Sequence, residues 1–553
     1  MTIPENEPVA LSLADNLLQS VLDSIPRTLH FKSKWSLIST KLTHLRSQLS
    51  DLSDYPTHPL SLELLRALSL TLSDALSLSS ACHQSTIPAG KLKTQNDVDS
   101  ISAQIDRHVA DTEVLVKSGV FQDSPRRSVS NSRRDRESIR VGARNVITRL
   151  QIGTSESKNS AMDEMLRLIH EDDRNVLIAV AQGAVPVLVR LLDSGSPSPE
   201  IREKAVAAIS RVSTVDSSKH LLIAEGLLLI NHLIRVVESG SGFAREKACV
   251  ALEALSHSKD NARAIGSRCG VSALLEICRV GTPGSRAVAA VVLRNLSEVP
   301  ENRENFIEEN AIQILLSLAA SGTISAQENA IGCLCRLVSD DDQLKLLIAR
   351  EGVIDSLKIF WDSATDRSLE VAVELLRHLA SFPLIAEVIV SEGFLTRIVS
   401  ALNCGVLSVR IAAAMSVYEL GSDPSIRKEL GEIECIPPLA RMLYGKAAEE
   451  RDAAARALSA LMGCAGNRRI FRRAERGIVS AVQMLDPLVQ NVDKKYPVSL
   501  LASLMHSKGC RKQMVAAGAR GYLQKLSETE VEGAKKLLEG LGKGKLWGVF
   551  ARS

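Results

Sequence analysis

The chain has 553 residues, too many for one ordinary hydrophobic core, so it must form several domains or one extended repeat array. Hydrophobic residues make up 45% of the chain and aromatic residues only 3%, which is typical of closely packed helices and disfavours an all-β fold. The net charge of +3 is nearly balanced and argues against nucleic-acid binding through a large basic face.

The cysteine pattern and the N-terminus bear on the compartment. The ten cysteines are scattered without a Cys-x-x-Cys pair, as expected of buried thiols in a reducing compartment. Residues 1–10 lack the basic start and apolar core of a secretory signal. No run of about 18 apolar residues occurs in the chain. We therefore expect a cytoplasmic or nuclear protein, or one found in both places, without a transmembrane segment.

The first predicted domain covers residues 8–118, which are rich in Leu and Ser. Apolar residues recur there every three or four positions, in two runs: Ile38, Leu42, Leu45, Leu49 and Leu52, and Val98, Ile101, Ile105 and Val109. Such spacing places the apolar side chains on one face of each helix. Prolines between the runs act as helix stops. The pattern predicts a four-helix-type bundle.

A basic linker is predicted over residues 119–138. It contains Ser124-Pro-Arg-Arg-Ser-Val-Ser-Asn-Ser-Arg-Arg-Asp-Arg136 and shows no apolar periodicity, so we expect it to be flexible. Ser128 and Ser130 stand near arginines and are candidate regulatory phosphosites. A weak nuclear-import signal and a plain solvated tether are the alternative interpretations.

After the linker, one short phrase recurs with a period of about 42 residues: a small residue, two or three apolar residues and a Leu-rich helix. The first residues of the successive copies are Gly142, Gly183, Gly226, Gly270, Asn310, Gly352, Gly393, Glu434, Gly477 and Gly518. Glycine at this corner suits a backbone with positive φ, and Asn tolerates the same conformation. Glu434 does not fit and predicts a differently built corner.

Three helices are predicted within each unit. In the unit that starts at Gly183, a first helix covers 183–192, a turn follows through 199, and a second helix covers 200–212. A short helix, such as 302–307, precedes the next corner. Three helices per unit favour armadillo over HEAT repeats.

The phrases Ala181-Gln-Gly-Ala-Val-Pro-Val-Leu-Val-Arg-Leu-Leu192 and Arg294-Asn-Leu-Ser297 carry a family resemblance. Residues 139–545 resemble the armadillo repeats of plant armadillo proteins and of vacuolar-protein-8-like adaptors. The resemblance implies an all-α fold, in which an armadillo-type α-α superhelix of about nine units and a terminal partial repeat follows the N-terminal bundle.

The predicted bundle resembles the helical domain that plant U-box armadillo ligases place before their U-box. In that family the U-box, with a Cys-Pro-Ile motif, would lie between bundle and repeats. Only residues 118–140 lie there, too few for such a domain. The resemblance therefore does not imply ligase activity of the chain's own.

The sequence shows no cluster of residues suited to catalysis. Its histidines stand singly, without a His-Glu-x-x-His pair or cysteines at metal-ligand spacing. We expect no enzymatic activity, no cofactor and no metal site.

The family resemblance implies that the last helix of each unit lines a concave groove that binds extended segments. Aligning these helices places Arg211, Asn295, Arg336 and His378 at equivalent positions, and together with the adjacent Arg294 and Arg377 they are the candidate groove residues. Arginines in such a groove favour acidic or phosphorylated segments, through charge-assisted hydrogen bonds. In the alternative interpretation they pair with local carboxylates on a solvated helix face.

These patterns predict a non-catalytic adaptor. Its repeats hold a segment of a partner protein, while the bundle binds a second protein or folds against the array. The alternative function is regulation of ubiquitination, as a partner or substrate receptor of a ligase.

Overall fold

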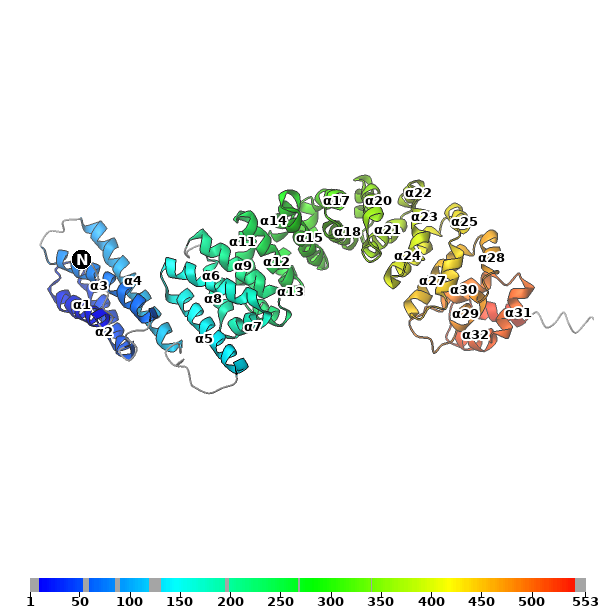
Figure 1. Cartoon of the computed structure of the whole chain (residues 1–553). Helices are drawn as coiled ribbons and strands as arrows, with labels where there is room; N and C mark the ends of the chain where they lie inside the picture. Colours follow the sequence, from blue (N-terminus) through cyan, green and yellow to red (C-terminus); the bar gives the residue numbers. More distant parts are fainter. Residues whose placement is uncertain are drawn as a thin grey trace, which may run out of the picture. The chain divides into compact units, whose positions relative to one another are not determined.

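The computed structural model describes residues 9–52, 59–84, 90–118, 131–193, 198–266, 269–339 and 341–542. Within these ranges the chain forms helices and no strand, which confirms the all-α prediction (Figure 1). Two compact units are distinguished, Met1–Leu255 and Ser256–Ser553. Among the described residues no single helix is both long enough and apolar enough to cross a bilayer, although two sharply bent helix pairs together reach that length and composition.

The first unit begins with four helices: α1 (Val9–Ser24), α2 (Lys32–Leu52), α3 (Pro59–Ala81) and α4 (Lys91–Lys117), with a 3-10 turn, η1 (Ile25–Arg27), after α1. Helix α1 packs on α3, α2 packs on α4, and α3 packs on α4. Their shared core holds the predicted apolar residues, among them Ile38, Leu42, Leu45, Val98 and Ile105 with no exposed surface. The apolar spacing thus identified the buried faces of α2 and α4 correctly.

The first repeats complete this unit. Their helices are α5 (Asn131–Ile152), α6 (Ser155–Glu171), α7 (Asp173–Ala181), α8 (Ala184–Leu191), α9 (Pro199–Ser213), η3 (Asp216–Ser218), α10 (Lys219–Ala224), α11 (Gly226–Ser239) and α12 (Gly242–Ser256). Helix α5 begins inside the segment predicted as linker, and Ser128 and Ser130 lie outside the described residues. Gly142 lies within α5, so it does not form the corner expected there.

The second unit repeats one order of three helices, counted here from the short helix. The short first helix precedes the corner, the second helix follows the corner, and the third helix completes the repeat. Its elements are α13 (Lys259–Gly266), α14 (Gly270–Val280), α15 (Pro283–Ser297), η4 (Pro300–Asn302), α16 (Arg303–Glu308), α17 (Ala311–Ser321), α18 (Ile324–Val338), α19 (Asp342–Arg350), α20 (Val353–Ser363), α21 (Leu369–Ala380), α22 (Pro383–Ser391), α23 (Phe394–Ala401), α24 (Leu407–Leu420), α25 (Pro424–Glu432), α26 (Ile436–Met442), α27 (Ala448–Leu461), α28 (Ala465–Phe471), α29 (Gly477–Gln483), α30 (Lys495–Ser503), α31 (Lys508–Ala516), α32 (Ala519–Glu528) and α33 (Ala534–Gly542). The third helices α15, α18, α21, α24, α27, α30 and α33 pack side by side in this order.

Most predicted corners have the expected left-handed backbone, with φ of 86° at Gly183, 89° at Gly352 and 53° at Asn310. Besides Gly142, three corners differ from expectation. Gly477 has no positive φ and already belongs to α29. Glu434 has φ of 62°, so its corner is built like the others, and the surrounding helices hold a side chain in a conformation that normally favours glycine. In the fourth copy Cys269 takes this role with φ of 61°, and Gly270 already belongs to α14.

Buried asparagines tie two of the third helices, α15 and α27, to the short first helix of the same repeat and to the start of the next repeat. Asn467 Nδ2 donates to the carbonyl of Leu461, at the end of α27, and to that of Arg427 on α25, at 3.0 and 2.8 Å. Asn302 bonds the carbonyls of Leu296 and Ala262 in the same way. Both asparagines are almost fully buried, so these bonds satisfy amide donors that would otherwise be buried unpaired, and they hold two helices of one repeat against the next repeat.

A glycine makes room for each of these asparagines, and this gives a test of their importance. A Cβ at Gly431 would stand 1.9 Å from Asn467 Oδ1. Gly431→Ala should displace the amide and lower the stability of the second unit by about 2 kcal/mol, because two buried hydrogen bonds are lost. The measurement is urea unfolding followed by circular dichroism.

Gly521→Ala in α32 is the matched control, because a methyl group there would meet nothing within 4 Å. This control should be neutral, or stabilising by up to about 1 kcal/mol. Equal unfolding midpoints for Gly431→Ala and the unmodified chain would contradict the proposed role of the asparagines.

Candidate partner-binding surface

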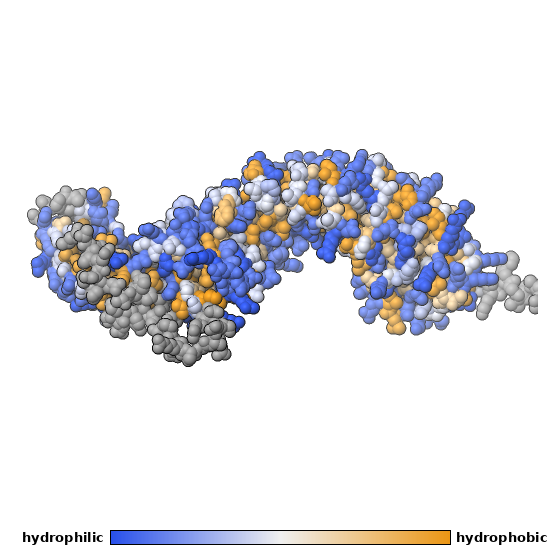
Figure 2. Space-filling view, in the orientation of Figure 1, coloured by the Kyte–Doolittle hydropathy of each residue, from blue (hydrophilic) through white to orange (hydrophobic). Residues whose placement is uncertain are grey.

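The third helices of the second unit bury one side and leave the other side polar. In α18, Ala330, Cys333 and Leu334 have no exposed surface and face neighbouring helices. Arg336 lies on the opposite side and its side chain is 56% exposed. Because the helices contact one another in sequence order, the polar sides of α15 to α30 form one surface, here called the third-helix face. In Figure 2 the visible surface of the repeats is mainly hydrophilic, with separate apolar patches.

Two of the candidate arginines are bound firmly within the fold. Arg377 donates from Nε and Nη2 to the two carboxylate oxygens of Glu374, at 3.0 and 2.6 Å, and its Nη2 lies 3.0 Å from His378 Nε2. Arg211, in the first unit, donates to the carbonyl of Ile169 at 3.0 Å and forms an ion pair with Asp173. For these residues the structure matches the alternative interpretation of pairing with local carboxylates.

Arg294 and Arg336 are held more loosely. Arg336 Nη2 lies 3.8 Å from Glu298 Oε1, and both side chains are about half exposed. Arg294 reaches a neutral acceptor, Asn329 Oδ1, at 3.3 Å. Exposed ion pairs contribute about 0–1 kcal/mol, so little free energy opposes an exchange of Glu298 for another carboxylate.

The arginines of α15, α18 and α21 gather around one buried thiol. Burial raises the pKa of Cys335 to about 12, with a further rise from Glu374 and opposing effects from Arg336, Arg377 and Arg294. Three guanidinium groups therefore share this area with the carboxylates Glu298 and Glu374. The remaining candidate, Asn295, donates to Ser256 Oγ at 2.8 Å. The structure thus brings the candidates of the second unit together and leaves Arg211 in the other unit.

A tyrosine cluster on the same face was missed by the sequence patterns. Tyr418 of α24 and Tyr496 of α30 meet edge to face, with ring centroids 5.6 Å apart. Arg456 of α27 lies over the Tyr496 ring at 4.4 Å and also bonds Asp452 at 2.6 Å. The sequence does contain a signal for Tyr418 alone, because tyrosine is rare in this chain, with five in all, and Tyr418 directly precedes the aligned position Glu419. This cluster adds aromatic surface to the third-helix face.

The N-terminal bundle also folds against the first repeats. Glu63 of α3 accepts hydrogen bonds from Thr154 N and Oγ1, both at 3.2 Å, and from Ser157 Oγ at 3.0 Å. The carboxylate thus satisfies the backbone N–H of the N-cap residue Thr154 and two hydroxyl groups, and its negative charge suits the positive end of α6. Helix α4 contacts α5 as well.

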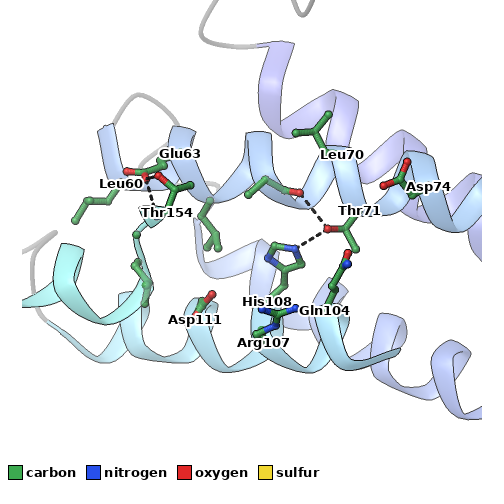
Figure 3. A pocket seen from close by; sticks show the side chains of 14 residues that line it. Leu60, Glu63, Leu70, Thr71, Asp74, Gln104, Arg107, His108, Asp111 and Thr154 are labelled. Carbon is green, nitrogen blue, oxygen red and sulfur yellow. Dashed lines mark hydrogen bonds between the residues drawn. The ribbon is translucent and has the colours of Figure 1, made fainter. Parts of the chain in front are cut away.

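A cavity of about 390 Å³ lies at this joint, between α3, α4 and residues 152–154 (Figure 3). His108 of α4 and Thr71 of α3 line it and are joined by a hydrogen bond, with His108 Nε2 2.9 Å from Thr71 Oγ1. Burial, and secondarily Arg107, lowers the pKa of His108 to about 4, so the ring is neutral at pH 7. Burial raises the pKa of Asp111 to about 6, although Lys158 and Arg107 oppose the rise.

Comparison with known proteins supports this architecture. The family model "Armadillo/beta-catenin-like repeat" matches residues 172–214. This match identifies an armadillo repeat in the segment from α7 to α9. A second model, "Domain of unknown function (DUF7032)", matches residues 12–120, the region of the bundle. The crystal structure of an engineered protein shares the fold, with a TM-score of 0.62, 22% identity, and coverage of 72% of this chain and 99% of that one.

Curated proteins similar to parts of this chain come from Arabidopsis thaliana. "U-box domain-containing protein 8" is 28% identical over 179 residues, covering 32% of this chain and 47% of the relative. "U-box domain-containing protein 16" is 26% identical over 243 residues, covering 40% and 34%. "Protein CELLULOSE SYNTHASE INTERACTIVE 2" is 33% identical over 130 residues, covering 23% and 6%. The chain spans less than half the length of each, and no U-box domain is found in it.

The armadillo fold is that of a protein-interaction scaffold and is typically non-catalytic. A scaffold role of this general kind agrees with the protein-binding function that the sequence predicts.

Asp111 provides a test of the joint between bundle and repeats. Its pKa is higher in the folded chain than the ordinary value of 3.8, so the folded state binds more protons between pH 4 and 6. The wild-type chain therefore loses stability as the pH rises through about 6. Asp111→Asn should raise the melting temperature at pH 7.5 by the equivalent of about 1 kcal/mol, allowing for solvent screening of this partly exposed group. At pH 4 it should have little effect.

Asp106→Asn serves as the control, because Asp106 lies on the other side of α4 and pairs with Lys41 at 2.6 Å. It should not raise the melting temperature at either pH. If Asp111→Asn and the wild type melt at the same temperature at pH 7.5, the charged Asp111 carboxylate does not destabilise the folded chain and the prediction is wrong.

Proposed function

We propose that the protein is a non-catalytic adaptor whose third-helix face binds an extended segment of a partner protein. The observation that carries the proposal is the pair of Arg294 and Arg336 on the adjacent third helices α15 and α18, where Arg336 is exposed and weakly paired and Arg294 has a neutral partner. The neighbouring tyrosine cluster offers aromatic surface to the same segment.

The preferred segment is acidic or phosphorylated. A guanidinium group binds carboxylate or phosphate through two parallel hydrogen bonds, which are stronger than bonds between neutral groups. Arg336 has only a 3.8 Å contact to exchange, and Arg294 has a neutral partner. Arg377 and Arg211, with their short internal bonds, hold the fold instead. Of the predicted groove arginines, Arg294 and Arg336 are therefore the two proposed to contact the partner segment.

The proposed location is the cytoplasm, the nucleus or both. Support comes from the cysteines, because all ten are free thiols and most are buried. Such thiols suit a reducing compartment.

A second proposed function, regulation of ubiquitination, is favoured by the similarity to two U-box domain-containing proteins. In this role the chain would act as a partner or substrate receptor of a ligase. Affinity purification of the full chain followed by mass spectrometry tests it. Ubiquitin-pathway proteins among the stable partners would support this role, and their consistent absence would contradict it.

The arginine proposal predicts a selective loss of binding. An array of acidic and phosphorylated peptides is probed with the full chain, and the affinity of the best peptide is then measured by fluorescence anisotropy. Arg294→Ala combined with Arg336→Ala should weaken that affinity about tenfold, equivalent to about 1.4 kcal/mol.

Two control variants remove the same kind of charge elsewhere. Arg279→Ala lies on α14, where Arg279 pairs with Glu276 at 2.9 Å, and Arg211→Ala lies in the first unit. Both should bind the peptide as the wild type does. Equal affinities for all variants would reject the proposed contacts, and an array without any bound peptide would reject the acidic ligand.

A further inference from the structure

A groove runs along the bundle between α3 and α4. The cavity at the joint is followed by a second cavity of about 420 Å³, and the two share Asp74 and Gln104 on their walls. Together they extend from Leu60 to Ala81 along α3, which is about 30 Å at 1.5 Å per residue. One end is closed by residues 152–154, which Glu63 holds in place. We call this feature the α3–α4 groove.

The walls of the groove suit a third helix. On α3 the residues Ala67, Leu70, Asp74, Leu78 and Ala81 are spaced by three or four positions, so they line one side of that helix. Leu70 is 59% exposed, an unusual exposure for a large apolar side chain at the edge of a cavity. A depression between two packed helices is the shape into which an amphipathic helix inserts its apolar side chains.

The charges of the groove are acidic and unpaired. Asp99 and Asp106, on the opposite side of α4, bind Lys34 and Lys41 of α2, each at 2.6 Å. The aspartates that line the groove are Asp74, Asp97 and Asp111. Within the part of the chain that the structure describes, none of these three forms an ion pair. The bundle therefore neutralises its carboxylates on one side and presents them on the other.

The other charged groups near the groove do not cancel its negative charge. Arg107 lies on its wall, and both Arg107 and Lys158 act on Asp111 from beyond ion-pair distance. Glu63 is occupied by Thr154 and Ser157. Phosphate-bearing ligands, including nucleic acids and anionic lipid surfaces, would be repelled by this arrangement.

We propose that the α3–α4 groove binds a basic amphipathic helix of a partner protein. Apolar side chains of that helix pack on Leu70 and Leu78, and its Lys or Arg residues pair with Asp74, Asp97 and Asp111. This site is separate from the third-helix face and takes a ligand of opposite charge, so it does not depend on the proposed function of that face.

The test uses the full chain and an 18-residue fluorescent peptide of Leu and Lys, designed as an amphipathic helix. A Leu/Glu peptide of the same pattern is the charge-reversed probe. We expect the Leu/Lys peptide to bind at least tenfold more tightly than the Leu/Glu peptide. The double variant Asp74→Asn with Asp97→Asn should weaken its binding about tenfold.

A matched control is available on the same helix. Asp99→Asn with Asp106→Asn changes the net charge equally but on the α2 side, and should alter binding less than twofold. Leu70→Gln tests the apolar contact without touching a carboxylate, and should also weaken binding. A benzophenone group at the centre of the peptide should crosslink within residues 60–81 or 97–111.

Several results would overturn the proposal. These are equal binding of both peptides, an equal effect of both double variants, no effect of Leu70→Gln, or crosslinks confined to the second unit. Circular dichroism of each variant verifies that the chain is folded before binding is compared.

Discussion

The second unit depends on the side-by-side packing of its third helices. Fully buried small residues, such as Ala290 on α15, Ala330 on α18, Ala413 on α24 and Ala454 on α27, let neighbouring helices approach closely. Each third helix from α18 to α30 is thereby covered by the third helix before it and the third helix after it. One side remains for polar residues, and the candidate binding surface is this remaining side. The buried asparagines serve the same packing, because they fix the helix ends.

The sequence predicts what repeats locally and misses what depends on distant contacts. The period, the corners and the apolar faces of α2 and α4 follow from spacing alone. Gly142 was misplaced because a glycine inside a helix looks the same as one at a corner. Glu434 was misjudged because packing overrides the modest cost of about 1–2 kcal/mol for a left-handed residue. Tyr418 and Tyr496 lie 78 positions apart, so no local pattern joins them.

The same limit applies to the candidate arginines. Aligned helices identify Arg211 and Arg336 as equivalent, although Arg211 bonds Asp173 from another helix and Arg336 is half exposed. A net charge of +3 also conceals two surfaces of opposite sign, an arginine group on the repeats and an aspartate-lined groove on the bundle. A chain with two such surfaces is suited to connect two partners of different charge, as an adaptor does.

Hydrogen–deuterium exchange of the full chain shows whether packing of the third helices holds the second unit together. If packed third helices form the core of the second unit, amides of α18, α21 and α24 should exchange about a hundredfold more slowly than those of α19 and α22, which are shorter and more exposed. An acidic peptide should then slow exchange further at α15 and α18. Exchange that is equally fast in the third helices and the short first helices would contradict the account.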